Sequence, residues 1–417
     1  MSFAKYLEKI KSDFKPAVKV EWLNPDESVN FEFTDSLFDM SVDVSVNYQN
    51  GCRRTCTLSL NNDKNKFPVN FNNIWIGQKF KLWMGIYLDD ETPYYLPQGV
   101  FYINNPSDVY NPNTRTITLN GVDKWAYLDG TLFGRLTGTY KTAIDTNLLD
   151  ALRQLLKLSR YKNDFGEAEN LIEAVDPVPP MLSPIFLTKT TTVNGKEKPV
   201  IECPYTAIVE RGGTLADVIL EYATILCASV YYDVHGRLVL EPLIDTADDI
   251  TDTNKEILWD YTVDEKTFLG LTQTYNFEKI HNDFVVLGNI ANGYQFKGRV
   301  QNRSPLSDTS INKIGLRPRD PIENNQYVSD EQCVELAKYY AKIDTILQRS
   351  GDISSTMLYH LDVNKLVTVS TPNNHMSKEL FLITGFSISS SGTMTINVTS
   401  VNILKDFSVV GVNMYEE

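Results

Sequence analysis

Hydrophobic and polar residues alternate in three successive runs in the first half of the chain, and three similar runs follow near its end. Alternation with a period of two predicts half-buried strands. The first set comprises residues 77–82, 99–103 and 114–122. The second set comprises residues 363–368, 380–384 and 391–398. We interpret the repeated order as two related antiparallel β-barrels in one chain, with chance similarity between strand sequences as the alternative.

The order of the patterns predicts a mainly β fold with α insertions (α+β), in which helical and irregular regions connect the two barrels. A short amphipathic run opens the chain, and turn residues then separate one strand from the next. The predicted regions are an N-terminal helical arm over residues 1–17, a first barrel over 18–141, a connecting region of helix and irregular chain over 142–213, and a second barrel region over 214–417.

The second barrel region contains the clearest local signals. Thr214 and Asp217 have the spacing of a capping box at a helix start, and Gly236 provides the turn of the following hairpin. Eight carboxylates and one lysine lie in residues 244–265, which favours a solvated acidic loop over a cation site. The predicted order is a helix and hairpin over 214–243, an acidic irregular insertion over 244–325, a helix over 329–348, and final barrel strands over 353–402.

Large aromatic residues and glycines mark expected structural positions in the barrels. We expect Trp83 and Trp125 to anchor the core of the first barrel, because large aromatic side chains bury much apolar surface. Gly99, Gly121 and Gly236 are expected where the chain turns or where backbones approach closely.

Two further groups of residues carry expectations about symmetry and contacts. The strands that contain Phe80 and Leu82, and Leu366 and Val367, are expected at equivalent places in the two barrels. Arg53 and Arg54 are interpreted either as solvent-exposed residues or as an interface that faces a neighbouring acidic edge.

Composition limits the class of protein. The chain has 417 residues, and its 39 basic against 53 acidic residues give a net charge of −14. Such a balance argues against a nucleic-acid-binding surface, which needs clustered Lys and Arg. No apolar run approaches the roughly 20 residues of a membrane span. The N-terminus is charged and unlike a secretory signal, so we expect synthesis in a cytoplasm.

Residues with catalytic or metal-binding chemistry are sparse. None of the four histidines has a His or Cys partner at metal-ligand spacing, and the five cysteines read as reduced, mostly buried thiols. Phosphate-binding loops and nucleophile motifs are absent from the sequence. We therefore expect no catalytic, cofactor or metal site. A glycosidase-like pair of acids among residues 89–91, beside Tyr94 and Tyr95, is the remaining enzymatic alternative.

The order of several segments resembles the hub proteins of phage tails. The helix and hairpin over 214–240 and the strand entry over 359–369 resemble segments of that family. The first barrel, with residues 53–56, 99–103 and 122–130, is similar to tail hubs of phages that infect Gram-positive bacteria and of related tailocins. The individual motifs are structural, and the resemblance rests on their order.

The resemblance implies a structural role in the baseplate or tail tip of a virion. Such hubs have two related β-barrels per chain and assemble as homotrimers, so that three chains adapt the six-fold tail tube to a three-fold tip. Expected partners are the tail tube or distal tail protein, the tape measure protein and a tip or spike protein, while genome DNA passes through the ring without specific binding.

Two alternatives to the hub remain open at this point. A receptor- or carbohydrate-binding tail protein would use loops with Tyr94, Tyr95, Tyr110 and Tyr127 to stack on sugars. A cell-wall hydrolase is the less favoured alternative. The chain ends at Glu417, soon after its last expected strand, which leads us to expect the tip and any lytic activity on another polypeptide.

Overall fold

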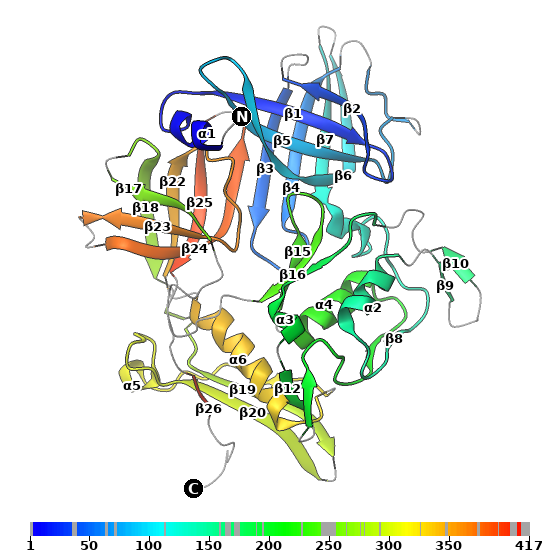
Figure 1. Ribbon diagram of the computed structural model, residues 1–417, viewed down its shortest axis with the longest axis vertical. Helices are drawn as coiled ribbons and strands as arrows, with labels where there is room; N and C mark the ends of the chain where they lie inside the picture. Colours follow the sequence, from blue (N-terminus) through cyan, green and yellow to red (C-terminus); the bar gives the residue numbers. More distant parts are fainter. Residues whose placement is uncertain are drawn as a thin grey trace.

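A long, twisted β-sheet organises the computed structural model (Figure 1). In the described part of the chain this sheet has 13 strands. The structure describes residues 1–417 except 1–2, 36–39, 63–65, 71–72, 112–113, 158–159, 163–167, 171–175, 189, 194–195, 227, 243–255, 264, 276, 279, 292, 326, 347–348, 373–375, 391, 401–406 and 410–417.

The first β unit follows the short helix α1 (Phe3–Lys9) and occupies the upper right of Figure 1. Its strands alternate between buried and solvent-facing residues, as the sequence pattern predicts. They pair in the order β3-β4-β7-β6-β5-β1-β2. Their bounds are β1 Lys15–Leu23, β2 Val29–Thr34, β3 Met40–Asn47, β4 Arg54–Asn61, β5 Lys79–Tyr87, β6 Pro93–Asn111 and β7 Thr114–Asp123.

The second β unit lies at the upper left of Figure 1 and continues the same sheet. Its strand β24 pairs with β3 of the first unit, so the two units are joined edge to edge by backbone hydrogen bonds. The strands of the second unit are β17 Ile257–Thr262, β18 Phe268–Tyr275, β22 Arg349–Thr356, β23 Leu366–Thr371, β24 Met376–Ser389 and β25 Thr393–Ser400.

The repeated three-strand order is confirmed. Strands β5, β6 and β7 form an antiparallel meander, and β23, β24 and β25 form a second one. The match extends to five strands, because β3-β4-β7-β6-β5 in one unit corresponds to β18-β22-β25-β24-β23 in the other. The last strands differ, since β1 runs antiparallel to β5 whereas β17 runs parallel to β23.

A middle lobe follows the first unit and contains the predicted helix and hairpin. Thr214 and Asp217 form the capping box: Thr214 Oγ1 accepts from the Asp217 N–H at 3.1 Å, and Asp217 Oδ2 accepts from the Thr214 N–H at 2.8 Å. The elements of this lobe are the 3-10 turn η1 Lys124–Tyr127, β8 Tyr140–Thr142, α2 Leu148–Leu155, β9 Arg160–Lys162, β10 Ala168–Asn170, β11 Met181–Leu182, α3 Ile185–Thr188, β12 Thr190–Val193, β13 Lys196–Pro199, β14 Ala207–Val209, α4 Leu215–Leu226, β15 Ala228–Tyr232 and β16 Leu238–Pro242.

A lower lobe lies at the bottom of Figure 1, and all of its elements except β26 are inserted between β18 and β22 of the second unit. The long helix α6 packs on a small sheet whose strands pair in the order β21-β19-β20-β26. The elements are β19 Asp283–Ala291, β20 Tyr294–Asn302, α5 Ile311–Ile314, β21 Ile322–Glu323, α6 Asp330–Ile346 and β26 Phe407–Val409.

The lower lobe corrects one expectation from sequence. Residues 244–325 were expected to be an irregular acidic insertion, but β17 and β18 within that range belong to the main sheet and β19 and β20 form a hairpin. In β17 exposed Asp260 alternates with buried Trp259 and Tyr261, but the many acidic residues of this region favoured a loop interpretation. The acidic residues at 245–252 lie outside the described residues.

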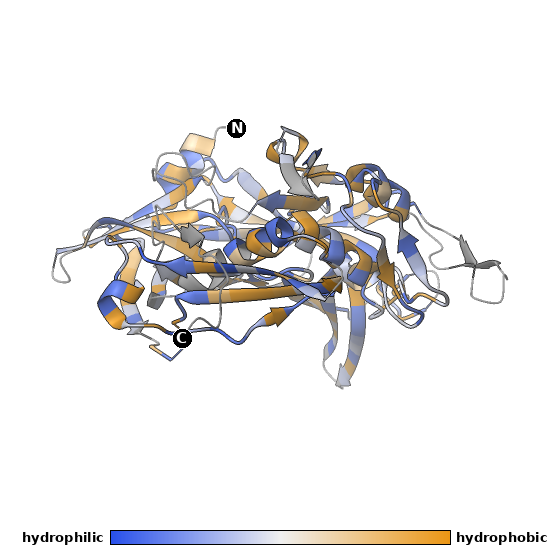
Figure 2. Ribbon diagram, turned by 90° about the horizontal axis from the view of Figure 1, so that it is seen from below, coloured by the Kyte–Doolittle hydropathy of each residue, from blue (hydrophilic) through white to orange (hydrophobic). Residues whose placement is uncertain are grey.

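Buried apolar side chains form two main cores. One core lies under the long sheet and combines residues of both β units, and the other fills the middle and lower lobes. Figure 2 shows hydrophobic and hydrophilic residues interspersed along the strands, as expected where one sheet face is buried. Among the described helices, none combines the length and apolar character needed to cross a membrane.

Candidate functional site

Three parts of the molecule, the two β units and the middle lobe, meet at a buried polar junction that begins at Arg53 and Arg54. Both arginines are almost fully buried at the start of β4. Their backbone N–H groups donate to Asp123 Oδ2 at 2.8 and 3.0 Å, and the Trp125 N–H donates to Asp123 Oδ1 at 3.0 Å. Burial raises the pKa of Asp123, although the three N–H donors oppose that shift. Asp123 therefore fixes the end of β7 and the start of η1 against β4.

The two guanidinium groups reach different parts of the chain. Arg53 stacks on the Tyr231 ring, with 3.5 Å from Cζ to the ring centroid, and its Nη2 donates to Ser229 of the same strand, β15. Arg54 Nη1 donates to the Tyr232 carbonyl at 3.1 Å, and Arg54 also pairs with Asp362 of the second β unit. One strand end thus binds the middle lobe and the second unit.

These contacts correct the expectation for the arginine pair. Neither side chain is solvent-exposed, and the acidic group that Arg54 faces belongs to the same chain. The sequence does not show that a partner lies about three hundred positions away. A charge this deeply buried is stabilised by ion pairing and hydrogen bonds, because desolvation without them costs several kcal/mol.

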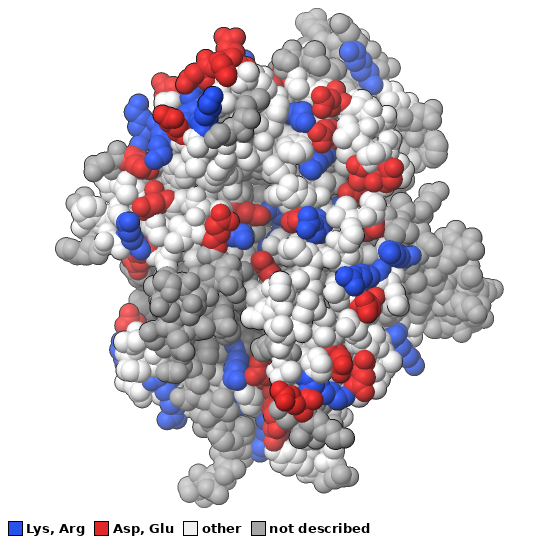
Figure 3. Space-filling model, in the orientation of Figure 1, with Lys and Arg blue, Asp and Glu red and all other residues white. Residues whose placement is uncertain are grey.

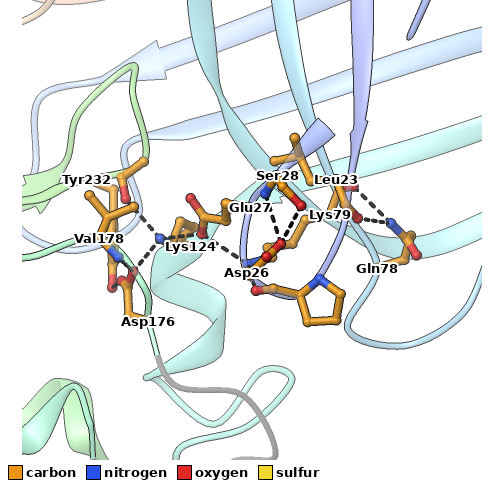
Figure 4. Close-up of polar contacts among 12 residues, drawn as sticks. Leu23, Asp26, Glu27, Ser28, Gln78, Lys79, Lys124, Asp176, Val178 and Tyr232 are labelled. Atoms are coloured by element: carbon orange, nitrogen blue, oxygen red, sulfur yellow. Dashed lines mark hydrogen bonds and ion pairs between the residues drawn. The ribbon is translucent and has the colours of Figure 1, made fainter. Parts of the chain in front are cut away.

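A second set of buried ions surrounds Lys124 (Figure 4). The ammonium lies 2.7 Å from a Glu27 oxygen and 2.6 Å from Asp176 Oδ1, and it donates to the Gly236 carbonyl at 2.9 Å. Tyr232 donates its hydroxyl proton to Asp176 Oδ2 at 2.8 Å, and burial raises the pKa of that tyrosine well above its ordinary value. Lys124 therefore links the β1–β2 hairpin, η1 and the turn of the β15–β16 hairpin.

Lys79 extends this network to β5. Its ammonium lies 2.9 Å from the same Glu27 carboxylate and donates to the Pro25 carbonyl at 3.0 Å. Burial lowers the pKa of Lys79, and the Glu27 charge opposes that shift. Sequence reasoning missed Glu27, Lys79 and Asp176, because isolated charged residues read as surface residues until their partners are known.

The tryptophans do not anchor the first core as expected. Trp83 lies on the outer face of β5, where the Lys19 and Lys81 ammonium groups lie 4.8 and 4.5 Å from its ring. Trp125 is buried, but in the core of the middle lobe. Trp22 of β1 takes the core position in the first unit. Neighbouring strand residues point to opposite faces, so Trp83 cannot share the core face of Leu82, and the expectation from side-chain size was wrong.

The three glycines lie where the backbone is crowded. A Cβ atom on Gly121 would come 2.5 Å from Cys56 Sγ, and one on Gly236 would come 2.9 Å from Val100 Cγ2. Gly236 has a φ of +74° in the β15–β16 turn, a conformation that favours glycine. Gly99 lies at the register shift between β5 and β6, against the Phe101 ring.

The strands of Phe80 and Val367 occupy matching positions, but the register differs by one residue from the sequence match. Phe80 lies opposite Phe101, and Val367 lies opposite Phe381, with all four side chains in the shared core. Leu366 therefore points to the other face, where it packs with Leu382. Leu82 corresponds to Val369, so the structural match is offset by one residue from the sequence match.

The acidic turn considered for a glycosidase has local roles. Asp89 lies 2.8 Å from the Lys9 ammonium, and Asp90 Oδ1 accepts from the Thr92 N–H at 3.1 Å. A shallow cavity of about 500 Å³ adjoins this turn and is lined by Lys5, Glu8, Lys9, Ser12, Leu88, Asp89 and Asp90. Among the described residues, no three His, Cys, Asp or Glu side chains gather as a metal site.

The tyrosines proposed for sugar stacking do not form one surface. The Tyr94 ring stacks on Tyr6 of α1 at 5.4 Å, and the Tyr127 ring stacks on Tyr102 at 4.8 Å. Tyr110 is 76% exposed near the tip of the β6–β7 hairpin. The stacked faces of Tyr94 and Tyr127 are taken up by other rings, and Tyr110 is exposed at the opposite end of β6 from Tyr94, so these tyrosines do not form a shared sugar-binding surface.

No protein-family model matches the sequence, and no curated protein sequence matches it either. Solved structures are similar over nearly the whole chain. The 43 kDa tail protein of prophage MuSo2 from Shewanella oneidensis is 12% identical, with a TM-score of 0.56 over 93% of this chain and 98% of that one. A tail protein from Neisseria meningitidis is 11% identical, with a TM-score of 0.57 over 94% and 98%.

Prophage tail protein gp18 from Listeria monocytogenes is 12% identical, with a TM-score of 0.51 over 92% of this chain and 94% of that one. The likeness includes both β units and the lobes between them, since it covers almost all of each chain. At identities this low the likeness establishes a shared fold. The chain therefore has the fold of phage and prophage tail proteins.

Proposed function

We propose that the chain is the structural hub of a phage or tailocin baseplate or tail tip, located in the virion tail. Three copies form a ring that adapts the six-fold tail tube to a three-fold tip and lines the DNA channel. One observation carries the proposal: two five-strand β units of matching order lie in one chain whose fold is that of phage tail proteins.

The repeat gives the ring its symmetry. A heterologous contact repeated around an axis closes a ring when its rotation allows closure. Three chains with two similar units each would present six similar positions to a six-fold tube. The same three chains would present three copies of the lower lobe to a three-fold tip. Duplication within the chain supports this role because three chains then carry six similar β units and three lower lobes.

The buried junction supports a role that needs its parts held in one relative orientation between tube and tip. Arg54 and Asp362 tie the two β units together at one point, while Lys124, Glu27 and Asp176 tie the first unit to the middle lobe. Charged groups that are buried and paired favour one relative orientation, because a shift would leave a charge without its partner. A symmetry adaptor needs such a fixed orientation between its units.

The proposed partners are the tail tube or distal tail protein, the tape measure protein and a tip or spike protein. A Francisella PdpA–VgrG complex has a TM-score of 0.52 to this chain at 10% identity, over 94% of this chain and 53% of that one. That structure is an assembly of more than one protein, and we propose that this chain likewise works in an assembly.

We propose that DNA passes through the ring without specific binding. The net charge of −14 disfavours phosphate contacts. Figure 3 shows acidic and basic side chains interspersed over the face in view.

We also propose that the chain has no catalytic activity, since the acids of the 89–91 turn serve an ion pair and a turn. The receptor-binding alternative gains no support from Tyr94 and Tyr127, which pack against other rings.

Absolute mass in solution tests the proposal. Light scattering on the purified chain should give a mass near three times 47.3 kDa, and negative-stain images of the same fraction should show rings with a central channel. A chain that stays monomeric at high concentration and in the presence of the tail tube and tip proteins would contradict the proposed ring. A monomer that bound cell-wall glycan would favour receptor binding instead.

A further inference from the structure

The joint between the two β units shows how one unit can bind the next. β23 covers one side of β24 as far as Leu382. Beyond that point β23 no longer covers this side of β24, and β3 of the first unit pairs with it instead. Gly385 lies opposite Asn47, Ile388 opposite Val44 and Ser389 opposite Asp43. The joint thus consists of the overhanging end of a second meander strand and the first strand of the next unit.

The first unit has the same overhang on β6. β5 covers one side of β6 as far as Tyr102, and the segment 104–111 pairs only with β7 among the described residues. Side chains 105–110 on this segment are exposed. In the repeat, β6 corresponds to β24, so this overhang corresponds to the part of β24 that holds β3.

The strand that corresponds to β3 also has a free side. It is β18, which pairs only with β22 among the described residues and ends the long sheet. β18 lies at the left of the upper layer in Figure 1, whereas β6 lies at its right. One molecule cannot bring its own two free edges together, but neighbouring molecules in a ring can.

The repeat fixes which residues would meet. Leu119 lies opposite Leu58, and Ile396 lies opposite Ile353, so these two pairs are equivalent core positions. Counting from them along β4 and β22, Val44 of β3 corresponds to Gln273 of β18, and Asp43 corresponds to Thr272.

Counting in the same way along β7 and β25, the third strands of the two meanders, shows which residues of β24 correspond to the overhang of β6. Ser107 lies opposite Thr118 of β7, the counterpart of Thr395 in β25, so Ser107 corresponds to Ser387. Asp108 then corresponds to Ile388, and Val109 to Ser389. Antiparallel pairing like that of β24 with β3 would set Asp108 opposite Gln273 of a second copy, and Val109 opposite Thr272.

The chemistry of the two positions is complementary. In the joint within the chain, Val44 and Ile388 form a buried apolar pair. At the equivalent free edges both positions are polar. The Gln273 side-chain nitrogen is buried without a hydrogen-bond partner among the described residues. Asp108 offers a partly exposed carboxylate, held by Arg115 at 2.6 Å, with lone pairs left to accept another hydrogen bond.

We infer that β18 of one copy adds to the overhang of β6 in the next copy, in the register of the β24–β3 joint, with Gln273 donating to Asp108. The inference rests on the proposed ring and names the strands that build it. Because the contact is heterologous, every copy uses one β18 edge and one β6 edge, and a closed ring leaves neither edge free.

Paired cysteines test the register. Val109→Cys and Thr272→Cys, made in separate proteins and mixed under mild oxidation, should form one disulfide between chains, and neither protein should do so alone. The protein with both substitutions should give covalent trimers. Leu269→Cys is the matched control, since Leu269 is exposed on the same strand three positions from Thr272. It should crosslink with Val109→Cys far less.

A swap of the polar pair gives a second readout. Asp108→Val leaves the Gln273 amide without an acceptor and should weaken assembly about tenfold per contact. Asp108→Val combined with Gln273→Val should recover most of that loss, because it recreates the apolar pair of the β24–β3 joint.

The outcomes separate this inference from the proposed hub. A protein that is trimeric by light scattering but crosslinks equally well through Leu269→Cys, or through neither site, would overturn the β18–β6 contact and leave the hub standing. A protein that stays monomeric, does not crosslink in any pair and forms no ring with its tail partners would overturn both. Selective crosslinking with rescue by the double substitution would support both.

Discussion

Asp362 pairs with the buried guanidinium of Arg54, although 308 positions separate the two residues in the chain. Arg54 begins β4 in the first β unit, and Asp362 lies between β22 and β23 in the second. The guanidinium also donates to the Tyr232 carbonyl of the middle lobe at 3.1 Å. One side chain therefore holds three parts of the molecule.

Removing the acid should destabilise the fold strongly. Asp362→Ala leaves the Arg54 charge buried without its partner, and we expect a loss of about 3 kcal/mol in the free energy of unfolding. Urea denaturation measures this loss in the free energy of unfolding. Asp308→Ala is the control, because Asp308 pairs with Lys313 on the surface and should cost under about 1 kcal/mol. Equal losses in the two variants would show that burial of the Arg54 pair adds nothing.

The sequence predicted the strand order better than the contacts of charged residues. Alternation revealed both meanders, because every strand of the long sheet buries one face. It could not reveal the register of β23, in which the four successive residues 366–369 are all buried. Only the pairing with β24 shows that Val367, and not Leu366, faces the shared core.

The buried junction could not be predicted from the sequence, for a different reason. Arg54 and Lys124 have the side chains of surface residues, and their burial becomes favourable only when distant acids complete their pairs. Asp362 supplies that partner for Arg54, and Glu27 and Asp176 supply it for Lys124. Local pattern therefore locates strands and capping boxes, while long-range pairing of charges needs the structure.

Gly121 should resist even a small substitution. The added Cβ of Gly121→Ala would come 2.5 Å from Cys56 Sγ and 3.0 Å from the Phe101 Cβ, which forces a local shift that costs about 1–3 kcal/mol. Thermal unfolding measures the loss. Adding Cys56→Ala removes the sulfur and should recover part of it. A double variant less stable than Gly121→Ala by the full cost of Cys56→Ala would contradict the clash.

The capping box should contribute measurably to α4. Thr214→Ala removes the hydroxyl that accepts from the Asp217 N–H, and we expect a loss of about 1 kcal/mol in the free energy of unfolding. Thr224→Ala in the same helix is the control, since Thr224 only donates to the Leu220 carbonyl one turn back. That control should be neutral or slightly stabilising. A similar loss in both variants would argue against a specific cap.

His360 should make stability depend on pH. The Tyr6 hydroxyl donates to Nδ1 at 3.1 Å, while the other ring nitrogen, Nε2, donates to the Leu258 carbonyl at 3.3 Å. Aromatic rings of Phe3 and Trp259 also contact the imidazole. This arrangement accommodates the neutral ring, and burial lowers the pKa of His360 to about 4.

The sign of this pH dependence follows from which state, folded or unfolded, binds the proton. Between the unfolded pKa of about 6.5 and the folded pKa of about 4, the unfolded chain takes up a proton that the folded chain rejects. Stability should therefore fall by about 3 kcal/mol as the pH drops through that window, and this contribution should be level below it.

Urea denaturation at about pH 7.5 and about pH 4.5 measures the change in the free energy of unfolding, and His360→Gln should remove this component of it. His235→Gln, in an exposed turn, should retain most of it. Identical pH dependence in wild type and His360→Gln would assign the effect to groups other than His360.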